Sequence, residues 1–216
     1  MQPTIVSRKD WLAARKALLA KELEMTHALD NLRAERRQLP WVRIEKGYVF
    51  EGSDGKCSLL DLFGDHSQLA IYHFMLTPGS DHICPGCSYT MDHVDAARQH
   101  FEQADLAFAA ISRAPIKRIE QVKARMGWSF PWLSSGDGPF NYDFGVSFTE
   151  PDRAAGRARY NYDKTKIQNS ADMFGVSVFI RGGDGDIFHT YSTYHRGTEP
   201  ADGRLQLARP GPQRPQ

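Results

Sequence analysis

Two cysteines three positions apart, Cys84 and Cys87, lie between an apolar run and an amphipathic segment. The run Gln68–Leu76 is almost continuously apolar, which is typical of a strand buried on both faces. After Cys87, apolar residues recur at intervals of three and four, from Met91 to Phe101, with charged residues between them. This spacing predicts a helix with one apolar face. The cysteines are therefore expected at the N-terminus of a helix that follows a buried strand.

The rest of the chain continues this alternation of strands and helices. Apolar runs predict further strands, and the spacing of apolar residues in 116–126 predicts a helix that Gly127 ends. The later strand candidates are 106–111, 130–133, 176–180 and 187–191, and short ones are expected between 41 and 50. Gly-rich residues 182–185 favour a hairpin between the last two. A βαβ unit followed by a β-hairpin is the layout of the thioredoxin fold. We predict an α/β protein with a central mixed β-sheet flanked by helices.

A long amphipathic helix is predicted near the N-terminus, ending before Pro40. Ser7 and Asp10 resemble a capping pair, and large apolar residues then recur every seven positions. These residues are Trp11, Leu18, Met25 and Leu32. The apolar stripe needs a cover, and the core of the same chain is the favoured one. The alternative is a homodimer formed through the N-terminal helix.

The predicted helix and a change of composition near the C-terminus divide the chain into three parts. Residues 1–40 are predicted to form an N-terminal helical extension, and residues 41–195 a thioredoxin-like domain. Residues 196–216 are polar and Pro-rich, so they bury little apolar surface. We interpret them as a tail.

Charge and composition exclude several classes of partner. The 27 basic and 26 acidic side chains leave a net charge of +1, without a long run of like charge. No nucleic acid is therefore expected as a partner. No run of eighteen apolar residues and no secretory signal are present, so we expect no membrane interaction and a cytoplasmic protein. Three cysteines are too few for a disulfide framework.

The placement of the pair suggests redox chemistry. A thiolate is the attacking species, and the N–H groups and dipole of a helix N-terminus favour its charge. Cys84 is the expected nucleophile, followed by Pro85, which suits the first helical position. Cys87, one turn later, is expected to resolve a mixed disulfide by forming a bond with Cys84. Ser88 is a candidate hydrogen-bond donor to the thiolate.

A non-catalytic zinc-binding or interaction domain is the alternative function. His73, His82 and His93 lie near enough in the sequence to be considered as further ligands of the cysteine pair. Their spacing does not complete a recognisable four-ligand set, so we assign no metal ligand. No Gly-rich phosphate loop is present, and we assign no cofactor. Cys57 is interpreted as a small buried apolar residue.

Several longer strings resemble a known bacterial family. They include Ser7–Arg15, Leu39–Val42, Tyr72–Met75, Cys84–Ser88, Ser112–Pro115, Met126–Trp132, Asn141–Phe148 and Phe188–Tyr194. On these strings the chain resembles a thioredoxin-like family catalogued as domain of unknown function 899, related to the AhpC/TSA peroxiredoxin group. The resemblance covers about nine-tenths of the chain, by its quoted strings.

The resemblance implies a thioredoxin-like fold and a thiol–disulfide oxidoreductase role, with Cys84 and Cys87 matching the family's cysteine pair. It implies a thiol or disulfide substrate without identifying it. Two features of better-known relatives are missing. The strand that begins at Gly175 lacks the proline that thioredoxins place opposite their cysteines. The segment before Cys84 lacks the Pro-x-x-x-Thr-x-x-Cys pattern of peroxiredoxins.

Overall fold

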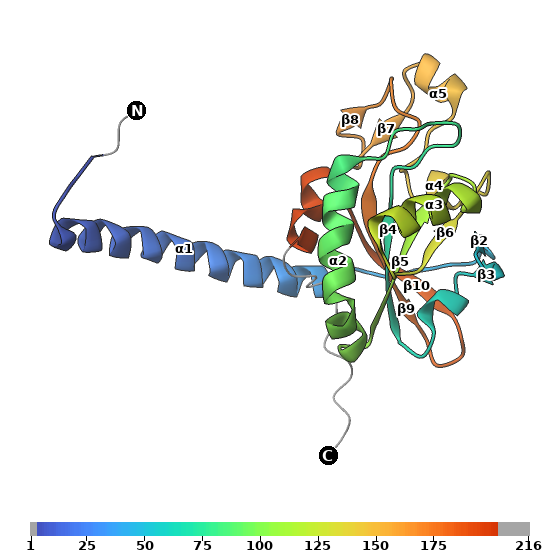
Figure 1. Ribbon diagram of the computed structural model, residues 1–216. Coiled ribbons are helices and arrows are strands. Elements are labelled where there is room, and N and C mark those ends of the chain that lie inside the picture. Colours follow the sequence, from blue (N-terminus) through green and yellow to red (C-terminus); the bar gives the residue numbers. More distant parts are fainter. Residues whose placement is uncertain (1–3, 203–216) are drawn as a thin grey trace. The chain divides into compact units, whose positions relative to one another are not determined.

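A computed structural model describes residues 4–202 of the chain (Figure 1). The chain divides into two compact units, Met1–Pro40 and Trp41–Gln216. None of the helices in the described residues combines the length and apolar composition needed to cross a membrane.

The first unit contains the helix α1 (Arg8–Arg37). The Ser7 side chain caps it, because its hydroxyl oxygen accepts a hydrogen bond from the backbone N–H of Asp10 at 3.2 Å. Arg36 and Arg37 occupy the last turn, where positive charge interacts favourably with the helix dipole. The prediction of a long N-terminal helix is confirmed. None of the α1 side chains is buried.

The second unit is built on an eight-stranded mixed sheet. In spatial order its strands are β1 (Val42–Arg43), β10 (Ile187–Tyr194), β9 (Gly175–Arg181), β4 (Gln68–His73), β5 (Leu106–Ser112), β6 (Trp132–Ser134), β2 (Val49–Gly52) and β3 (Gly55–Ser58). The central strands β4, β5 and β6 run parallel, whereas β9 and β10 form an antiparallel hairpin beside β4. The predicted mixed sheet and C-terminal hairpin are confirmed.

Both faces of the sheet are apolar and covered. All six residues of β4 are buried, and alternate residues face opposite sides, so Tyr72 belongs to one core and Ile71 to the other. The helices α2 (Pro85–Gln103) and α3 (Ile116–Met126) cover the Tyr72 face. The short helices η1 (Asp61–Phe63) and α4 (Phe140–Asp143) cover the Ile71 face. The prediction of a thioredoxin-like α/β fold with flanking helices is confirmed.

A small subdomain between α4 and β9 was not predicted from the sequence. It contains α5 (Glu150–Ala154) and the two-stranded sheet of β7 (Arg159–Tyr160) and β8 (Thr165–Lys166). Its own apolar core consists of Val146, Phe148, Ala158, Tyr160, Ile167 and Tyr194. Tyr194 ends β10, so this core joins the subdomain to the main sheet.

The segment after β10 differs from the predicted tail. Residues His195–Asp202 form the 3-10 helix η2, and Thr198 is buried. Composition was misleading because a short helix can be fixed by a few contacts while its other residues stay polar. Hydrogen bonds support the turn: the hydroxyl of Tyr160 accepts the N–H of His195 at 2.9 Å, and Thr198 donates to the carbonyl of His195 at 2.8 Å. The rest of the predicted tail, 203–216, lies outside the described residues.

Candidate dithiol site

The cysteine pair lies at the start of α2, directly after the segment that leaves the buried strand β4. Cys84 is the N-cap residue, and Pro85 occupies the first helical position. The Sγ atom of Cys84 accepts the backbone N–H of Cys87 at 3.3 Å. The predicted placement at a helix N-terminus is confirmed. The catalytic roles of the two residues stay predictions.

The two thiols have different environments. Cys87 is 1% exposed and belongs to the apolar core between α2 and the sheet. Cys84 is half-buried at its edge, so its sulfur remains accessible. Both are free thiols. One sulfur can therefore meet a substrate while the other stays one helical turn away from it.

Hydrogen bonding lowers the pKa of Cys84 from 9.0 to about 6. The largest cause is the hydrogen bond with the Cys87 side chain, and the backbone N–H groups of Cys87 and Gly86 add to it against the opposing effect of burial. His82 lowers the pKa further through its charge. Donors aimed at a sulfur stabilise the thiolate over the thiol. Cys84 is thus mainly a thiolate at neutral pH.

Burial raises the pKa of Cys87 well above its usual range, and the nearby Cys84 sulfur raises it further. A charge in this apolar position would lose most of its hydration. The pair therefore holds one shared proton on Cys87, with negative charge on Cys84. This asymmetry is the arrangement expected of an attacking and a resolving thiol.

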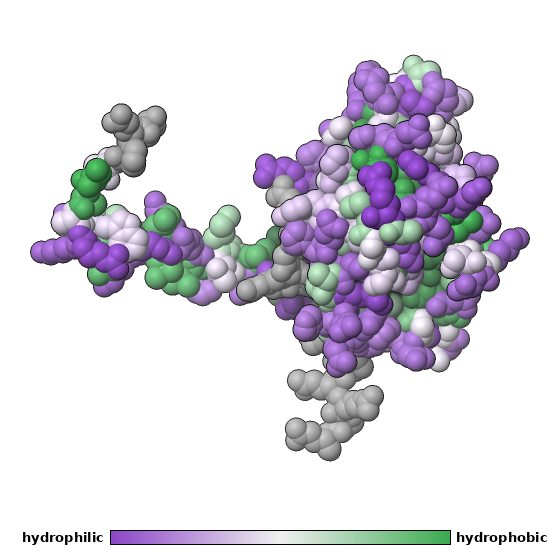
Figure 2. All heavy atoms as spheres, viewed as in Figure 1, coloured by the Kyte–Doolittle hydropathy of each residue, from purple (hydrophilic) through white to green (hydrophobic). Residues whose placement is uncertain are grey.

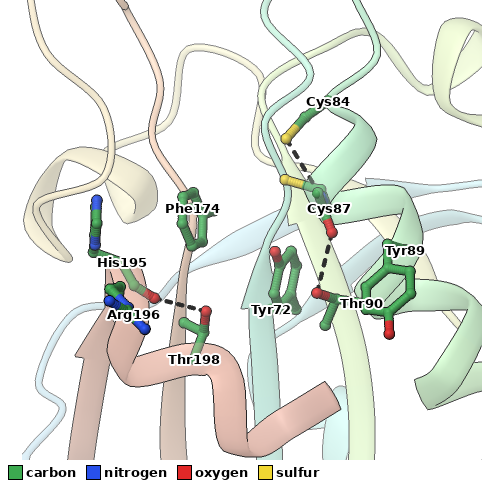
Figure 3. Close-up of a pocket in the computed structure, with 10 residues that line it drawn as sticks. Tyr72, Cys84, Cys87, Tyr89, Thr90, Phe174, His195, Arg196 and Thr198 are labelled. Atoms are coloured by element: carbon green, nitrogen blue, oxygen red, sulfur yellow. Dashed lines mark hydrogen bonds between the residues drawn. The ribbon is translucent and has the colours of Figure 1, made fainter. Parts of the chain in front are cut away.

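Tyr72 is the polar partner of the buried thiol. The hydroxyl of this β4 residue lies close enough to Cys87, and to Thr90 on the next turn of α2, to interact with both. Burial raises the pKa of Tyr72 well above its usual range, so it remains a neutral donor. Figure 3 shows its hydroxyl directed toward Cys87 from below the pair. The Thr90 hydroxyl donates to the carbonyl of Gly86 at 3.1 Å.

The cysteines open into a cavity of about 210 Å³. One side is formed by the start of α2 and by Tyr72, and the other by Phe174 and three residues of η2 (Figure 3). Its lining residues are Tyr72, Cys84, Gly86, Cys87, Tyr89, Thr90, Phe174, His195, Arg196 and Thr198. The ring of His195 stacks on that of Phe174, with centroids 6.3 Å apart. The cavity is thus small, partly aromatic and bordered by basic side chains.

Most residues opposite the cysteines were missed by the sequence analysis. Phe174 stands directly before Gly175, at the start of the strand whose missing proline had been noted. His195, Arg196 and Thr198 belong to the segment predicted as a tail or its border. No local pattern marks these residues, because they reach the site through the β9–β10 hairpin. Among the cavity residues outside α2, Tyr72 could have been expected from the sequence, because side chains alternate along a strand and its position lies on the face that α2 covers.

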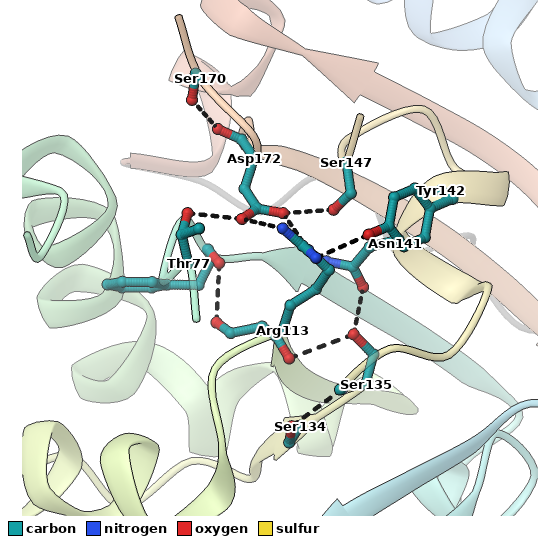
Figure 4. Close-up of polar contacts among 12 residues, drawn as sticks. Thr77, Arg113, Ser134, Ser135, Asn141, Tyr142, Ser147, Ser170 and Asp172 are labelled. Atoms are coloured by element: carbon teal, nitrogen blue, oxygen red, sulfur yellow. Dashed lines mark hydrogen bonds and ion pairs between the residues drawn. The ribbon is translucent and has the colours of Figure 1, made fainter. Parts of the chain in front are cut away.

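A buried ion pair ties together the two segments that border the cavity (Figure 4). Asp172, two residues before Phe174, binds Arg113 at the end of β5 through contacts of 2.7 and 3.0 Å. The same carboxylate accepts the hydroxyl of Thr77, in the segment between β4 and Cys84, at 2.6 Å. A bidentate Arg–carboxylate pair fixes geometry as well as charge. Asp172 therefore connects two segments at the Arg113 guanidinium: the one that leads to Cys84 and the one that leads to Phe174.

Two smaller expectations, on Ser88 and Cys57, differ from the structure. Ser88 does not donate to the thiolate, because its hydroxyl donates to the carbonyl of Cys84 at 3.0 Å. This i to i−4 bond is the usual one for a serine inside a helix. Cys57 was expected to be buried, but it is half-buried in β3. It lies at the edge of the sheet, where the strand has only one neighbour.

Two of the three histidines considered as metal ligands, His73 and His93, are separate from the pair, whereas His82 lies near enough to Cys84 to lower its pKa. His73 is fully buried on the other face of the sheet, where its Nε2 atom lies 2.9 Å from the hydroxyl of Ser177. His93 is exposed, and its Nδ1 atom lies 2.8 Å from the carbonyl oxygen of Tyr89. Within residues 4–202, no three side chains of His, Cys, Asp and Glu come close enough together to hold a metal ion.

Comparison with known proteins identifies the family. The sequence matches the family described as bacterial protein of unknown function (DUF899) over residues 1–212. The chain belongs to this family. The resemblance drawn from the sequence strings is confirmed. No curated protein matches the sequence.

Solved structures with a similar fold include peroxiredoxins. Peroxiredoxin Q from Xanthomonas campestris has a TM-score of 0.54 at 17% identity, covering 76% of this chain and 92% of its own. Peroxidoxin BcpB from Mycobacterium tuberculosis has a TM-score of 0.50 at 15% identity, covering 79% of this chain and 98% of its own. PrxQ from Xylella fastidiosa has a TM-score of 0.50 at 18% identity, covering 74% of this chain and 87% of its own. At these identities the similarity shows the thioredoxin-like fold alone.

Proposed function

We propose that this protein is a thiol–disulfide oxidoreductase in which Cys84 attacks and Cys87 resolves. The observation that carries the proposal is the opposite ionisation of two neighbouring thiols. The Cys84 sulfur accepts a backbone N–H and has a pKa lowered to about 6, whereas the buried Cys87 keeps its proton. An attacking thiol with a pKa near ambient pH is close to optimal, because it is both ionised and nucleophilic.

The reaction proceeds in two exchanges. The Cys84 thiolate attacks one sulfur of a disulfide substrate, forms a mixed disulfide and releases the first substrate thiolate. Cys87 then loses its proton, to the released thiolate or to water, and attacks the Cys84 sulfur. The second substrate thiolate leaves, and a Cys84–Cys87 disulfide remains. Two electrons have moved from the dithiol to the substrate, and an external thiol must restore the pair.

The surroundings of the pair support this division of roles. The substrate enters from the cavity side, where Cys84 is accessible and Cys87 is covered. Tyr72 supplies a hydroxyl to the Cys87 sulfur when its charge develops in the second exchange. Thiol chemistry of this kind requires a reducing compartment to regenerate the pair, which is consistent with the cytoplasm as its location.

Peroxide is a second candidate electron acceptor for the same site, because the structures of similar fold include peroxiredoxins. The Cys84 thiolate would attack the peroxide oxygen, forming a sulfenic acid and releasing an alcohol or water. Cys87 would then condense with the sulfenic acid, releasing water and forming the same disulfide. The two acceptors share the cysteine roles and differ only in the first oxidant. The zinc-binding alternative lacks a ligand cluster among the described residues.

The decisive experiment is a thiol titration of a Cys57→Ser variant in glutathione buffers of varied ratio, followed by mass spectrometry. We expect a reversible loss of two hydrogen masses, mapped to a peptide linking Cys84 and Cys87. Cys84→Ser and Cys87→Ser variants serve as controls and should show only mixed disulfides or none. A pair that stays reduced, or oxidises irreversibly, across the accessible potentials would contradict the proposal.

The acceptor is then identified by offering oxidised glutathione, a disulfide-bonded protein and an organic hydroperoxide separately. The rate of Cys84–Cys87 disulfide formation is measured with each at equal concentration. A peroxide rate far above both disulfide rates would assign the peroxidase reaction. The reverse order would assign disulfide reduction.

A further inference from the structure

The helix α1 carries a row of large apolar side chains, and none of its residues is buried. Trp11, Leu18, Met25 and Leu32 recur every seven residues and are between 46% and 75% exposed. Figure 2 shows hydrophobic side chains along this helix. Thirty residues of α-helix extend for about 45 Å. So long an exposed apolar row is unusual in a chain that acts alone.

The spacing of this row is that of a helix-pairing surface. A seven-residue repeat keeps one stripe of a helix facing a neighbouring helix. With the four large residues at one core position of the repeat, Ala14 and Ala28 fall at the other. Small residues there allow two helix backbones to approach closely. The same position also holds Lys21, near the middle of α1, and Glu35, near its end.

The distribution of charge along α1 favours a particular partner and orientation. Residues 8–21 contain five basic side chains and one acidic, a net charge of +4. Residues 22–37 contain four acidic and three basic side chains, a net charge of −1. Two copies in parallel would place the +4 halves side by side. Two antiparallel copies place each +4 half beside a −1 half, and Lys21 beside the Glu22 region of the partner.

We infer that α1 pairs antiparallel with α1 of a second copy of this chain. A self-complementary surface of this kind closes into a two-fold dimer, the commonest form of oligomer. The pairing covers the heptad row and supplies the tertiary support that an isolated helix lacks, because isolated helices derive little stability from their own hydrogen bonds. It is independent of the thiol chemistry, since all residues of the dithiol site belong to the unit 41–216.

The first test is the mass of the full chain in solution, measured by light scattering at micromolar concentration. We expect twice the 24.4 kDa of one chain. The double variant Leu18→Glu with Met25→Glu should halve this mass. The matched control, Ala20→Glu with His27→Glu, adds the same charge at the same spacing about 200° around the helix, and should leave the dimer intact.

Folding of the variants is checked separately by the rate of Cys84 alkylation, which reports the intact second unit. A wild-type chain of 24.4 kDa would overturn the inference. So would a dimer that survives the Leu18 and Met25 substitutions. A monomer that instead binds vesicles of anionic phosphatidylglycerol would assign α1 to a membrane surface.

The second test fixes the orientation with single cysteines, after Cys57, Cys84 and Cys87 have been changed to serine. In an antiparallel pair, each large residue of the apolar row lies opposite the other core position of the partner, so Leu18 faces Ala28. Leu18→Cys and Ala28→Cys chains should therefore form disulfides with each other when mixed. Neither should link to itself, because like positions lie about 15 Å apart along the axis. Self-linked products without the mixed product would contradict the antiparallel arrangement.

Discussion

Replacing Cys87 by alanine or by serine separates the two parts of the environment that activates Cys84. Alanine removes the side-chain hydrogen bond, the largest cause of the low Cys84 pKa, and leaves the backbone N–H groups in place. Serine keeps a donor at the same position. We therefore expect the pKa of Cys84 to rise toward 9.0 in Cys87→Ala and to stay at about 6 in Cys87→Ser.

The size of the effect follows from the thiolate fraction. At pH 6, a thiol with a pKa of about 6 is roughly half ionised. If the pKa rises to about 7 the ionised fraction falls about fivefold, and if it rises to about 8 it falls about fiftyfold. The expected loss of Cys84 thiolate at pH 6 in Cys87→Ala lies between these values, and the loss of rate is smaller because a thiolate of higher pKa is more nucleophilic. Well above pH 9, where all three thiols are ionised, Cys87→Ala should react at least as fast as the parent protein.

The assay is the rate of alkylation by iodoacetamide between pH 4.5 and pH 10, in the Cys57→Ser background, with the labelled peptide identified by mass spectrometry. The midpoint of each profile gives the pKa of Cys84 directly. Superimposed profiles for the alanine and serine variants would refute the role of the Cys87 side chain. A midpoint near 9 in the parent protein would refute the activated thiolate altogether.

Three further predictions concern other contacts of the site. Tyr72→Phe should slow the second thiolate release from a chromogenic disulfide more than the first, because the hydroxyl lies next to Cys87, the thiol that attacks in the second exchange. Equal slowing of both phases in stopped flow would contradict this. Asp172→Asn should lower the free energy of unfolding in urea by about 3 to 5 kcal/mol, because it leaves the buried Arg113 charge without the Asp172 carboxylate. A loss below about 1 kcal/mol would instead indicate that the ion pair is as well hydrated as one on the surface. The free energy of unfolding of the reduced protein, relative to that of Cys84→Ser, should rise from pH 6 to pH 9. The pKa of Cys84 is lower in the folded state than in the unfolded state, so the stabilising contribution of its thiolate is lost as pH falls through about 6. A difference in thermal unfolding between the two proteins that does not change with pH would contradict this.

The sequence predicted the elements that have a strong period or continuous apolar character. The strand containing Tyr72 is buried on both faces, so its composition alone marked it. The helix after Cys84 and the N-terminal helix follow their apolar spacing, and Ser7 marked the start of the latter. In these segments local preference and tertiary packing agree, which is why periodicity was sufficient.

The subdomain at 146–173 was missed because its elements are too short to carry a period. Each of its two strands has two residues, and the turn between them is made by Asn161, Tyr162 and Asp163, all with positive φ. Asparagine and aspartate tolerate this conformation, whereas tyrosine rarely adopts it. Tyr162 is fixed there by a hydrogen bond from its hydroxyl to the carbonyl of Ser192, a contact between residues thirty positions apart.

The cysteines were found from sequence, but the cavity around them was not. Cys84 and Cys87 lie within four residues of one chain segment, whereas Phe174 and the residues of η2 come from the ends of the β9–β10 hairpin. The contact of Asp172 with Arg113 spans fifty-nine positions, and neither residue stands in a pattern that pairs them. Such contacts depend on the register of the sheet, which local spacing does not specify.

The helix η2 has a consequence for any shortened form of the protein. A chain cut at residue 195, where the composition turns polar, would retain both cysteines and every strand of the sheet. It would lose Arg196 and Thr198, two of the four residues that form one side of the cavity. The surroundings of Cys84 would then differ from those in the full chain. Substrate preferences measured on such a truncated chain would describe a more open thiolate and not the selectivity of the full chain.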